Sequence, residues 1–255
     1  MTLSEIRQTL EKRGLRPLKQ FGQNFLFDAN LCRFIVDSLP VNNSARVLEI
    51  GPGLGALTEM MLKKNWRVTA IETDRGLCDW LKEKFQNSEH FSLVEGDALR
   101  LLSQYPHPHI IGNLPYNIST PLLAELLKLD PLPRACVFTL QKETGQRLAA
   151  QPRTKDYGII SVAVQRFYKV EILKTLPRGV FFPEPKVESI VARLTIIPEE
   201  AASVQEREGF YRFLKLGFSH RRKMLKSVLP VPLTARAEEL SIQEWIQLYQ
   251  TVRPS

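Results

Sequence analysis

The sequence is poor in residues that bind metals or form disulfide bonds. Its only cysteines are Cys32, Cys78 and Cys136, four histidines occur in 255 residues, and there is no C-x-x-C pair. No histidine stands at zinc-ligand spacing from a cysteine. A disulfide scaffold and a structural zinc site are therefore excluded, and no metal site is predicted.

Long hydrophobic runs are also missing. No window approaches the roughly 18 apolar residues of a membrane span, and the first residues lack the basic-then-apolar layout of a secretory signal. Hydrophobic residues make up 44% of the chain and charged residues 24%. These fractions are ordinary for globular proteins and argue against disorder, collagen-like repeats and coiled coils. We expect a cytoplasmic protein with no membrane partner.

Acidic residues are in deficit, but only in part of the chain. The net charge is +8; residues 31–150 are neutral, whereas residues 151–255 hold 17 basic and 11 acidic side chains. Basic residues between positions 212 and 226 meet no acid and alternate with four aromatic ones, namely Phe210, Tyr211, Phe213 and Phe218. Such a mixture suits a nucleic-acid backbone with bases available for stacking. A solvated helix face is an equally good interpretation of this stretch alone.

Apolar runs of strand length alternate with helical periodicity from residue 46 onward. Strands are predicted at 47–50, 67–71, 91–94, 109–111 and 135–140, with helices between them. This alternation indicates an α/β fold with a parallel sheet that helices cover on both faces. Two later strands, at 167–176 and 187–197, flank a proline-punctuated loop at 177–185 and are expected to form an antiparallel edge.

The two ends of the chain are predicted to lie outside this sheet. We assign residues 1–30 to an N-terminal helix and arm, residues 31–200 to the sheet domain and residues 201–255 to a basic helical domain. Thr2 and Glu5 have capping-box spacing, which predicts a helix over 2–13. The segment 198–203 is the expected boundary before the last domain.

A glycine loop follows the first sheet strand and opens a helix. Gly51 and Gly53 begin a pattern that fits both a dinucleotide-binding loop and a methyltransferase loop. Glu72, at the end of the next strand, fits a ribose-binding acid in either case. Glu49, two residues before the first glycine, resembles the first motif of class I S-adenosylmethionine-dependent methyltransferases. Asp97 closes the third strand, where such enzymes bind the adenine amino group.

The motif that decides between these alternatives is Asn113-Leu114-Pro115-Tyr116, directly after the fourth strand. The exocyclic nitrogen of adenine is a poor nucleophile because its lone pair is delocalised into the ring. The Asn113 side-chain oxygen and the Leu114 carbonyl can accept its two hydrogens and aim that lone pair at a methyl-sulfonium. Pro115 restricts the backbone before it, and Tyr116 offers a ring on which a base can stack. The motif predicts methylation of adenine N6 without a metal.

The ordered motifs resemble the ribosomal RNA adenine dimethyltransferases along nearly the whole chain, in particular the type that acts on small-subunit 16S rRNA. The matching segments are 22–26, 49–58, Glu72, Asp97, 113–119, 141–143, 157–158, 181–189, 218–223 and 236–241. The resemblance implies a mostly parallel seven-stranded, Rossmann-like sheet with an antiparallel edge. It also implies dimethylation of two adjacent adenosines near the 3′ end of the RNA, during ribosome biogenesis.

The resemblance also implies roles for individual residues. The S-adenosylmethionine site would comprise Asn24, Leu26, Gly51, Gly53, Glu72, Asp97, Ala98 and Asn113. Asn113 through Tyr116 would hold the target base, and Phe181 would stack on its other face, with the adjacent Phe182 as the alternative ring. Arg221, Arg222 and Lys223 would contact RNA phosphates in an immature 30S subunit, with the enzyme acting as a monomer. Glu184 departs from the family, which usually has proline there.

Three alternatives remain beside this interpretation. A large-subunit rRNA dimethyltransferase shares the asparagine motif, but segments 181–189 and 221–223 favour the small-subunit type. A DNA adenine methyltransferase would more often have proline at position 114, where this chain has leucine. An inert RNA-binding assembly or transcription factor would not need Asn24, Glu72, Asp97 and Asn113.

Overall fold

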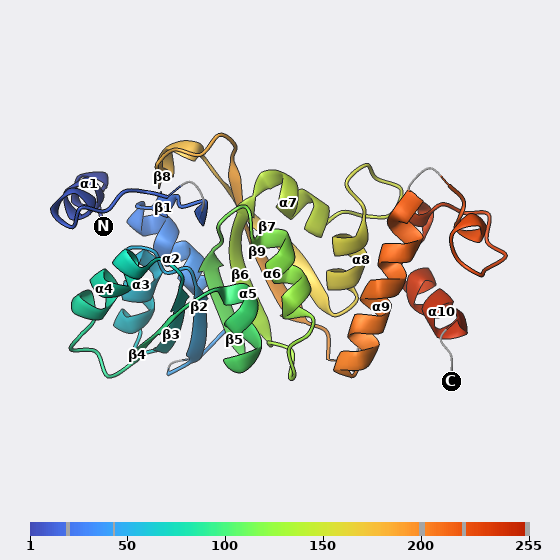
Figure 1. Ribbon diagram of the computed structural model, residues 1–255, viewed down its shortest axis with the longest axis horizontal. Helices are drawn as coiled ribbons and strands as arrows, with labels where there is room; N and C mark the ends of the chain where they lie inside the picture. The colour runs from blue at the N-terminus through green and yellow to red at the C-terminus, as the bar shows by residue number, and fades with distance from the viewer. Residues whose placement is uncertain (19–20, 43, 199–201, 221–222, 253–255) are drawn as a thin grey trace.

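The computed structural model describes residues 1–18, 21–42, 44–198, 202–220 and 223–252. The molecule is elongated, with a helix-covered sheet on one side and a smaller group of helices at the C-terminal end (Figure 1). Arg221 and Arg222, two of the three predicted phosphate contacts, lie outside the described residues. No helix within the described ranges has both the length and the apolar character needed to cross a membrane.

A seven-stranded sheet forms the centre of the molecule, in the order β4-β3-β2-β5-β6-β9-β7 (Figure 1). Its strands are β2 (Arg46–Ile50), β3 (Arg67–Glu72), β4 (Phe91–Glu95), β5 (His109–Asn113), β6 (Ala135–Gln141), β7 (Tyr168–Leu176) and β9 (Ser189–Ile196). Strands β2 to β6 are parallel, and β9 runs antiparallel between β6 and β7. The predicted α/β class I methyltransferase fold is confirmed. The antiparallel strand β9 is the last strand in the sequence, but it lies inside the sheet, and β7 forms the edge.

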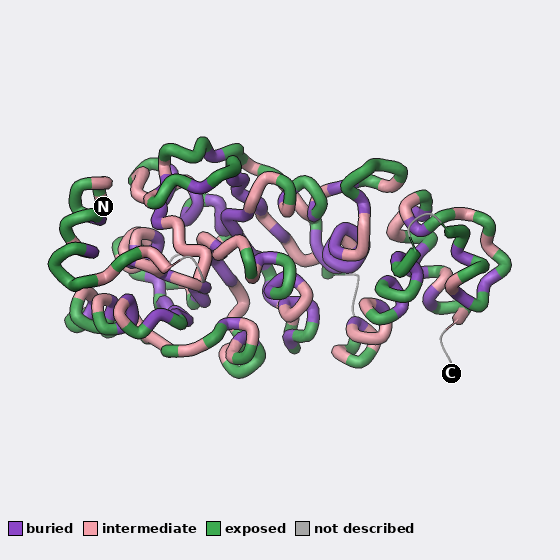
Figure 2. The backbone as a smooth tube through the Cα atoms, turned by 45° about the horizontal axis from the view of Figure 1, so that its top comes forward, coloured by how far each residue is buried: buried purple, intermediate pink, exposed green. Residues whose placement is uncertain are grey.

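Helices cover both faces of the sheet, as the alternating pattern predicts. One face packs against α2 (Ala29–Asp37) and α3 (Ala56–Lys63), and the other against α5 (Ala98–Leu101), α6 (Ser119–Leu126) and α8 (Ile159–Gln165). Helices α4 (Arg75–Lys84) and α7 (Lys142–Leu148) complete the sheet domain. The central strands and the inner helix faces are buried, whereas the edge strands β4 and β7 are mostly half-buried or exposed. Helix α1 and the C-terminal helices also expose their outer faces (Figure 2).

The N-terminal arm is attached to the sheet domain by a small second sheet. Helix α1 (Leu3–Lys12) begins with the predicted capping box of Thr2 and Glu5. After the arm, β1 (Phe25–Leu26) pairs antiparallel with β8 (Phe181–Phe182), which lies in the segment expected to be only a loop. The expectation of a loop without a strand is therefore wrong. A strand of two residues forms through tertiary contact and leaves no periodicity in the sequence.

Helix α2 is a second element that was not predicted from the sequence. Asp28 caps its first turn, and Leu31, Cys32, Ile35 and Val36 form its buried face. All three cysteines of the chain are buried and unpaired.

The C-terminal helices share the core of the sheet domain. Helix α9 (Val204–Gly217) and helix α10 (Ile242–Val252) contribute Phe210, Phe213 and Trp245 to the same hydrophobic cluster as β6. The prediction that the interleaved aromatics are available to bases is wrong for Phe210, Phe213 and Phe218, because all three are buried. Phe218 stacks on Trp245 with ring centroids 5.3 Å apart. Burial of these large apolar rings stabilises the fold. The rings are therefore not free to stack on RNA bases.

Arg207 connects α9 to the sheet domain through its buried guanidinium. It donates hydrogen bonds to the backbone carbonyls of Leu127 at 2.8 Å, Leu129 at 2.6 Å, and Ala202. Arg207 is only 4% exposed, and burial of an unpaired guanidinium charge is costly. The hydrogen bonds to three backbone carbonyls offset this cost. The C-terminal helices are thus joined to the segment after α6 by polar as well as apolar contacts.

Candidate functional site

A cavity opens where the carboxyl ends of the parallel strands meet. This is the expected ligand position in an open α/β sheet. The arm and the loops after β2, β3, β4 and β5 line it. Of the residues predicted for the cofactor and base pockets, those lining the cavity are Asn24, Leu26, Gly51, Gly53, Glu72, Asp97, Ala98, Asn113, Leu114, Pro115 and Tyr116. The structure therefore brings these residues from five separate segments to one place.

The glycine loop turns with left-handed backbone at positions where other residues would be strained. The φ angles are +65° at Gly51 and +58° at Gly53. A Cβ atom at Gly53 would lie 3.1 Å from the Phe25 ring of the arm. The glycine therefore lets the arm and the loop approach each other beside the cavity.

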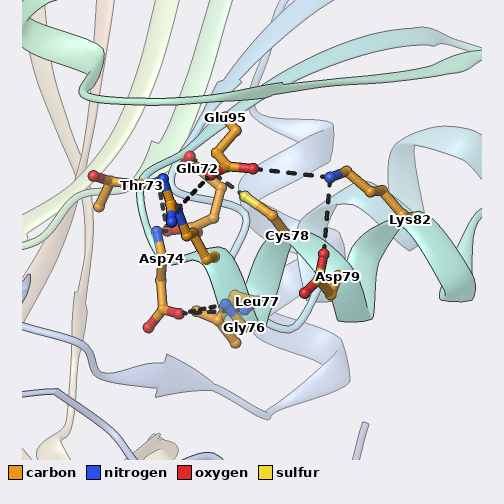
Figure 3. A network of polar contacts seen from close by, with 10 residues as sticks. Glu72, Thr73, Asp74, Gly76, Leu77, Cys78, Asp79, Lys82 and Glu95 are labelled. Carbon is orange, nitrogen blue, oxygen red and sulfur yellow. Dashed lines mark hydrogen bonds and ion pairs between the residues drawn. The ribbon is translucent and has the colours of Figure 1, made fainter.

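Glu72 is the centre of a polar network at the end of β3 (Figure 3). Its carboxylate accepts hydrogen bonds from the backbone N–H groups of Gly53 at 3.1 Å, Thr73 at 2.9 Å and Asp74 at 3.0 Å. Burial raises the pKa of this carboxyl, and the three backbone donors counteract the rise. The result is a buried, oriented acceptor at the cavity wall.

Glu49 lies beneath the glycine loop, where its carboxyl is 1% exposed. The Thr58 hydroxyl of α3 donates to it over 2.5 Å. Burial raises the pKa of Glu49 to about 7. The residue therefore ties the loop to α3 and carries an acid that titrates near neutrality.

Asp97 and Ala98 form the wall at the end of β4. The Asp97 carboxylate caps α5 by accepting a hydrogen bond from the Leu99 N–H at 2.9 Å, and the residue is exposed. Ala98 is buried behind it. The exposed carboxylate keeps acceptor capacity toward the cavity, because each carboxylate can accept several hydrogen bonds.

The side chain of Asn113 is fixed by the N-terminal arm. Its amide nitrogen donates to the Asn24 carbonyl over 2.8 Å, and no described residue donates to its oxygen. The next residue, Leu114, is held by a 3.1 Å hydrogen bond from its N–H to the Thr139 carbonyl. The donor side of the Asn113 amide is thus occupied, and the acceptor side is left for a ligand.

Tyr116 is half-buried and its hydroxyl has a partner. The phenolic oxygen lies 2.8 Å from the Ser189 hydroxyl, and either group can donate. Burial raises the pKa of Tyr116, so the phenol stays protonated at neutral pH. Ser189 ends the matching segment 181–189, and the sequence alone predicts no role for it.

Phe181 and Phe182 do not line the cavity in the described structure. Phe181 is 3% exposed and packs in the hydrophobic cluster beneath β1 and α2. Phe182 is partly exposed, packs near Phe25 and carries the guanidinium of Arg7 at 5.3 Å from its ring centroid. A stacking role for Phe181 thus remains a prediction that requires the ring to leave this cluster.

Gln23 and the first helix are site features that sequence reasoning missed. The Gln23 amide accepts from the Leu18 N–H and donates to Asp74, each over 2.8 Å. Met1 and Ile6 of the N-terminal segment also line the cavity. The matching motif at 22–26 could have indicated Gln23, but the position of α1 depends on tertiary contacts that leave no local signal.

The basic C-terminal segment presents its cations to solvent. Arg212, Lys215, Lys223 and Lys226 are all exposed. Lys215 lies 5.0 Å from the ring centroid of Tyr211, the one predicted stacking residue that is not fully buried. Within the part of the chain that the structure describes, no group of three or more His, Cys, Asp or Glu side chains is placed to hold a metal ion.

Comparison with known families identifies the chain. The model of the family described as "Ribosomal RNA adenine dimethylase" matches residues 15–253. The chain belongs to this family. The predicted family of rRNA adenine methyltransferases is thereby confirmed.

Curated relatives of this dimethylase cover nearly its full length. It is 39% identical to a protein of Hahella chejuensis, over 93% of each chain, and 37% identical to one of Acaryochloris marina, over 94% of this chain and 98% of that one. Both relatives carry the name Ribosomal RNA small subunit methyltransferase A.

Solved structures agree on the fold of the dimethylase. A dimethyladenosine transferase from Plasmodium falciparum superposes with a TM-score of 0.77 at 23% identity, covering 88% of this chain and 95% of that one. The 23S rRNA methyltransferase ErmE superposes with a TM-score of 0.68 at 24% identity, covering 90% and 99%. These similarities support the class I methyltransferase architecture of the sheet domain.

Proposed function

We propose that this enzyme transfers methyl groups from S-adenosylmethionine to N6 of two adjacent adenosines near the 3′ end of small-subunit 16S rRNA, giving N6,N6-dimethyladenosine. The observation that carries the proposal is the orientation of Asn113. Its amide nitrogen is bound to the Asn24 carbonyl, so its oxygen is the atom available at the cavity wall. An oriented acceptor is what the amino group of adenine requires.

The residues around the cavity fit S-adenosylmethionine. Glu72 supplies a buried carboxylate for the ribose hydroxyls, and the backbone of Gly51 and Gly53 leaves room for close approach. Asp97 and Ala98 also line the cavity and would recognise the adenine of the cofactor. Asn24 and Leu26 would close the site from the arm. When bound, the cofactor supplies an electrophilic methyl group on a sulfonium sulfur.

The chain's own groups position the target base and its lone pair. The Asn113 oxygen and the Leu114 carbonyl accept the two N6 hydrogens, which draws the nitrogen toward tetrahedral geometry. Tyr116 stacks on the extruded base, and Phe181 would enclose its second face after rearrangement of β8. Such positioning of two reactants can lower a barrier by roughly 7–11 kcal/mol in well-oriented systems. Acceptor dipoles matched to the charge developing on nitrogen add to this effect.

RNA binding is assigned to the exposed basic surface of the C-terminal segment. Arg221, Arg222 and Lys223 would contact phosphates together with the exposed cations of α9. The neutral middle of the chain and the basic end then serve different ligands. We propose an immature 30S subunit as the partner and a monomer as the active form.

The small subunit is favoured over the large one by the curated relatives. Matches at 35% to 39% identity over most of the chain are named small-subunit methyltransferases. The solved 23S rRNA methyltransferase shares the fold at 24% identity, which is too distant to transfer a substrate. The large-subunit alternative therefore has less support.

A parallel substrate experiment tests the proposal. Labelled S-adenosylmethionine is offered with unmethylated small subunits, large subunits, and naked rRNA of each kind. We expect label on small-subunit RNA alone, mapped to two adjacent adenosines as dimethyladenosine. Label on large-subunit RNA alone would overturn the substrate, and binding of RNA with no label anywhere would favour an inert assembly factor.

A further inference from the structure

The hydroxyl of Tyr116 is held by a residue from a distant strand. Ser189 stands 73 positions later in the chain, and the two oxygens are 2.8 Å apart. Tyr116 lines the cavity, whereas Ser189 does not. The contact therefore connects the base-binding motif to a residue behind the site.

Ser189 occupies a position with little freedom to move. It is the first residue of β9 and is paired with Gln141 of β6 on one side and Leu176 of β7 on the other. Its side chain is fully buried. Because β9 runs antiparallel to β6, the start of β9 lies at the carboxyl edge of the parallel strands, beside the site. The sheet thus fixes the serine oxygen against both neighbouring strands.

An anchored hydroxyl determines the plane of the Tyr116 ring. A tyrosine side chain turns about two bonds, and a hydrogen bond at its far end restricts both. Loss of the partner would leave a half-buried phenol without its hydrogen bond, a state that favours other ring orientations. Stacking on a base depends on the ring plane, so the anchor acts on the base and not on the cofactor.

We propose that Ser189 is a positioning residue for methyl transfer, which holds the Tyr116 ring in the plane that receives the target adenine. The proposal rests on the proposed role of Tyr116 as the base-stacking residue. It assigns to Ser189 a function at the second substrate, although its own side chain is buried and does not line the cavity.

A double-mutant cycle tests this role. Single-turnover methyl transfer to small subunits is measured for the wild type, Ser189→Ala, Tyr116→Phe and the double variant, with cofactor affinity measured in parallel. We expect each single variant to lose about tenfold in rate, with the dissociation constant for the cofactor within twofold of the wild type. The double variant should also lose about tenfold, because both changes remove the same hydrogen bond. Losses that multiply to about a hundredfold, or a wild-type rate in Ser189→Ala, would overturn the proposal.

A matched control separates positioning from general stability. Ser161 is also fully buried and donates a hydrogen bond to the Arg147 carbonyl over 2.6 Å, in helix α8. Ser161→Ala should cost similar stability and leave the transfer rate within twofold. If both serine variants lose rate in proportion to their melting temperatures, Ser189 has only a structural role. Tyr116→Phe keeps the ring and tests the anchor even if Ser189→Ala folds poorly.

A binding measurement keeps the inference separate from the proposed function. RNA with 2-aminopurine at the target adenosine loses fluorescence when that base stacks on an aromatic ring. Wild-type protein should quench this signal, and Ser189→Ala and Tyr116→Phe should quench it several-fold less. Methyl transfer is measured separately, on RNA that carries adenosine at this position, because 2-aminopurine has no N6 amino group to accept a methyl group. Normal quenching by the wild type with no methyl transfer to the adenosine RNA would defeat the proposed function alone. Equal quenching by all variants would defeat the positioning role alone.

Discussion

The side-chain amide of Asn113 donates a 2.8 Å hydrogen bond to the backbone carbonyl of Asn24, 89 residues earlier in the chain. The contact joins the end of β5 to the N-terminal arm at the wall of the cavity. It gives the amide one orientation, and it makes the arm part of the wall that would receive the target base in the proposed function.

Replacement of Asn113 by alanine should abolish methyl transfer. The variant lacks the acceptor for an N6 hydrogen and the contact with the arm, so we expect a rate loss of a thousandfold or more. Cofactor affinity should fall less than tenfold, because Glu72 and the glycine loop remain. Stopped assays with labelled cofactor give the rate, and calorimetry gives the affinity. Unchanged turnover would contradict the proposed base-binding mechanism.

Replacement of Glu72 by glutamine should weaken cofactor binding. The amide cannot accept hydrogen bonds on both of its ends, whereas the carboxylate accepts from three backbone groups and would also bind the ribose. Hydrogen bonds to a charged acceptor contribute about 1.5–3 kcal/mol, so we expect a tenfold to hundredfold higher dissociation constant. Glu95→Gln is the matched control, because Glu95 ends the next strand but does not line the cavity. It pairs with Arg75 and with Lys82 (Figure 3).

The stability of the wild type should fall with rising pH because of Glu49. Its pKa is raised from the model-compound value of 4.5 to about 7 in the folded protein. The folded state therefore holds this proton more tightly than the unfolded chain does. The tighter proton binding adds about 3 kcal/mol to the free energy of unfolding. This contribution is complete below about pH 4.5 and is lost as the pH rises through 7.

Glu49→Gln removes this titration and keeps an acceptor for the Thr58 hydroxyl. The free energy of unfolding, measured by urea denaturation, should shift in favour of the variant by about 3 kcal/mol between pH 4.5 and pH 8. A difference between the two proteins that stays constant over this pH range would show that Glu49 titrates normally.

Replacement of Arg221, Arg222 and Lys223 by alanine should weaken RNA binding and its dependence on salt. Each lost phosphate contact lowers the slope of log affinity against log salt by roughly 0.7 to 0.9. We expect a slope reduced by about two to three, with unchanged cofactor affinity. Titrations at several salt concentrations measure it. An unaltered slope would place the phosphate contacts elsewhere on the basic surface.

Arg207→Ala should destabilise the protein strongly. The change leaves the carbonyls of Leu127, Leu129 and Ala202 without their buried donor. We expect a loss of about 3 kcal/mol or more in the free energy of unfolding. Arg212→Ala, on the exposed side of the same helix, should change it by less than about 0.5 kcal/mol. Similar losses in both variants would show that the buried hydrogen bonds are not the cause.

Local patterns were sufficient to predict the sheet and the position of its ligand. The strands alternate with helices clearly enough to give their order in sequence, and Glu72, Asp97 and Asn113 each stand near the end of a parallel strand. Such ends meet at one edge of any open α/β sheet. The residues that line the cavity from β2 to β5 could therefore be named from the sequence.

Contacts between distant segments could not be predicted in this way. The pairing of Leu26 with Phe181 buries a ring that was expected to face the base, and it leaves no periodic signal. The aromatic residues of α9 look like a stacking surface in sequence, but Trp245 covers Phe213 and Phe218. The Ser189 anchor depends on the register of β9, which the sequence pattern does not fix.

The shared core of the sheet and the C-terminal helices has a consequence for target choice. Because α9 is packed and hydrogen-bonded onto the sheet domain, the basic surface and the Asn113 pocket are held at a constant separation. If the basic surface binds RNA phosphates as proposed, this fixed separation would limit methylation to adenosines that the folded RNA places at the same distance from the bound phosphates. Selection among many adenosines would then depend on this separation and on the folded shape of the RNA, without contacts that depend on base sequence.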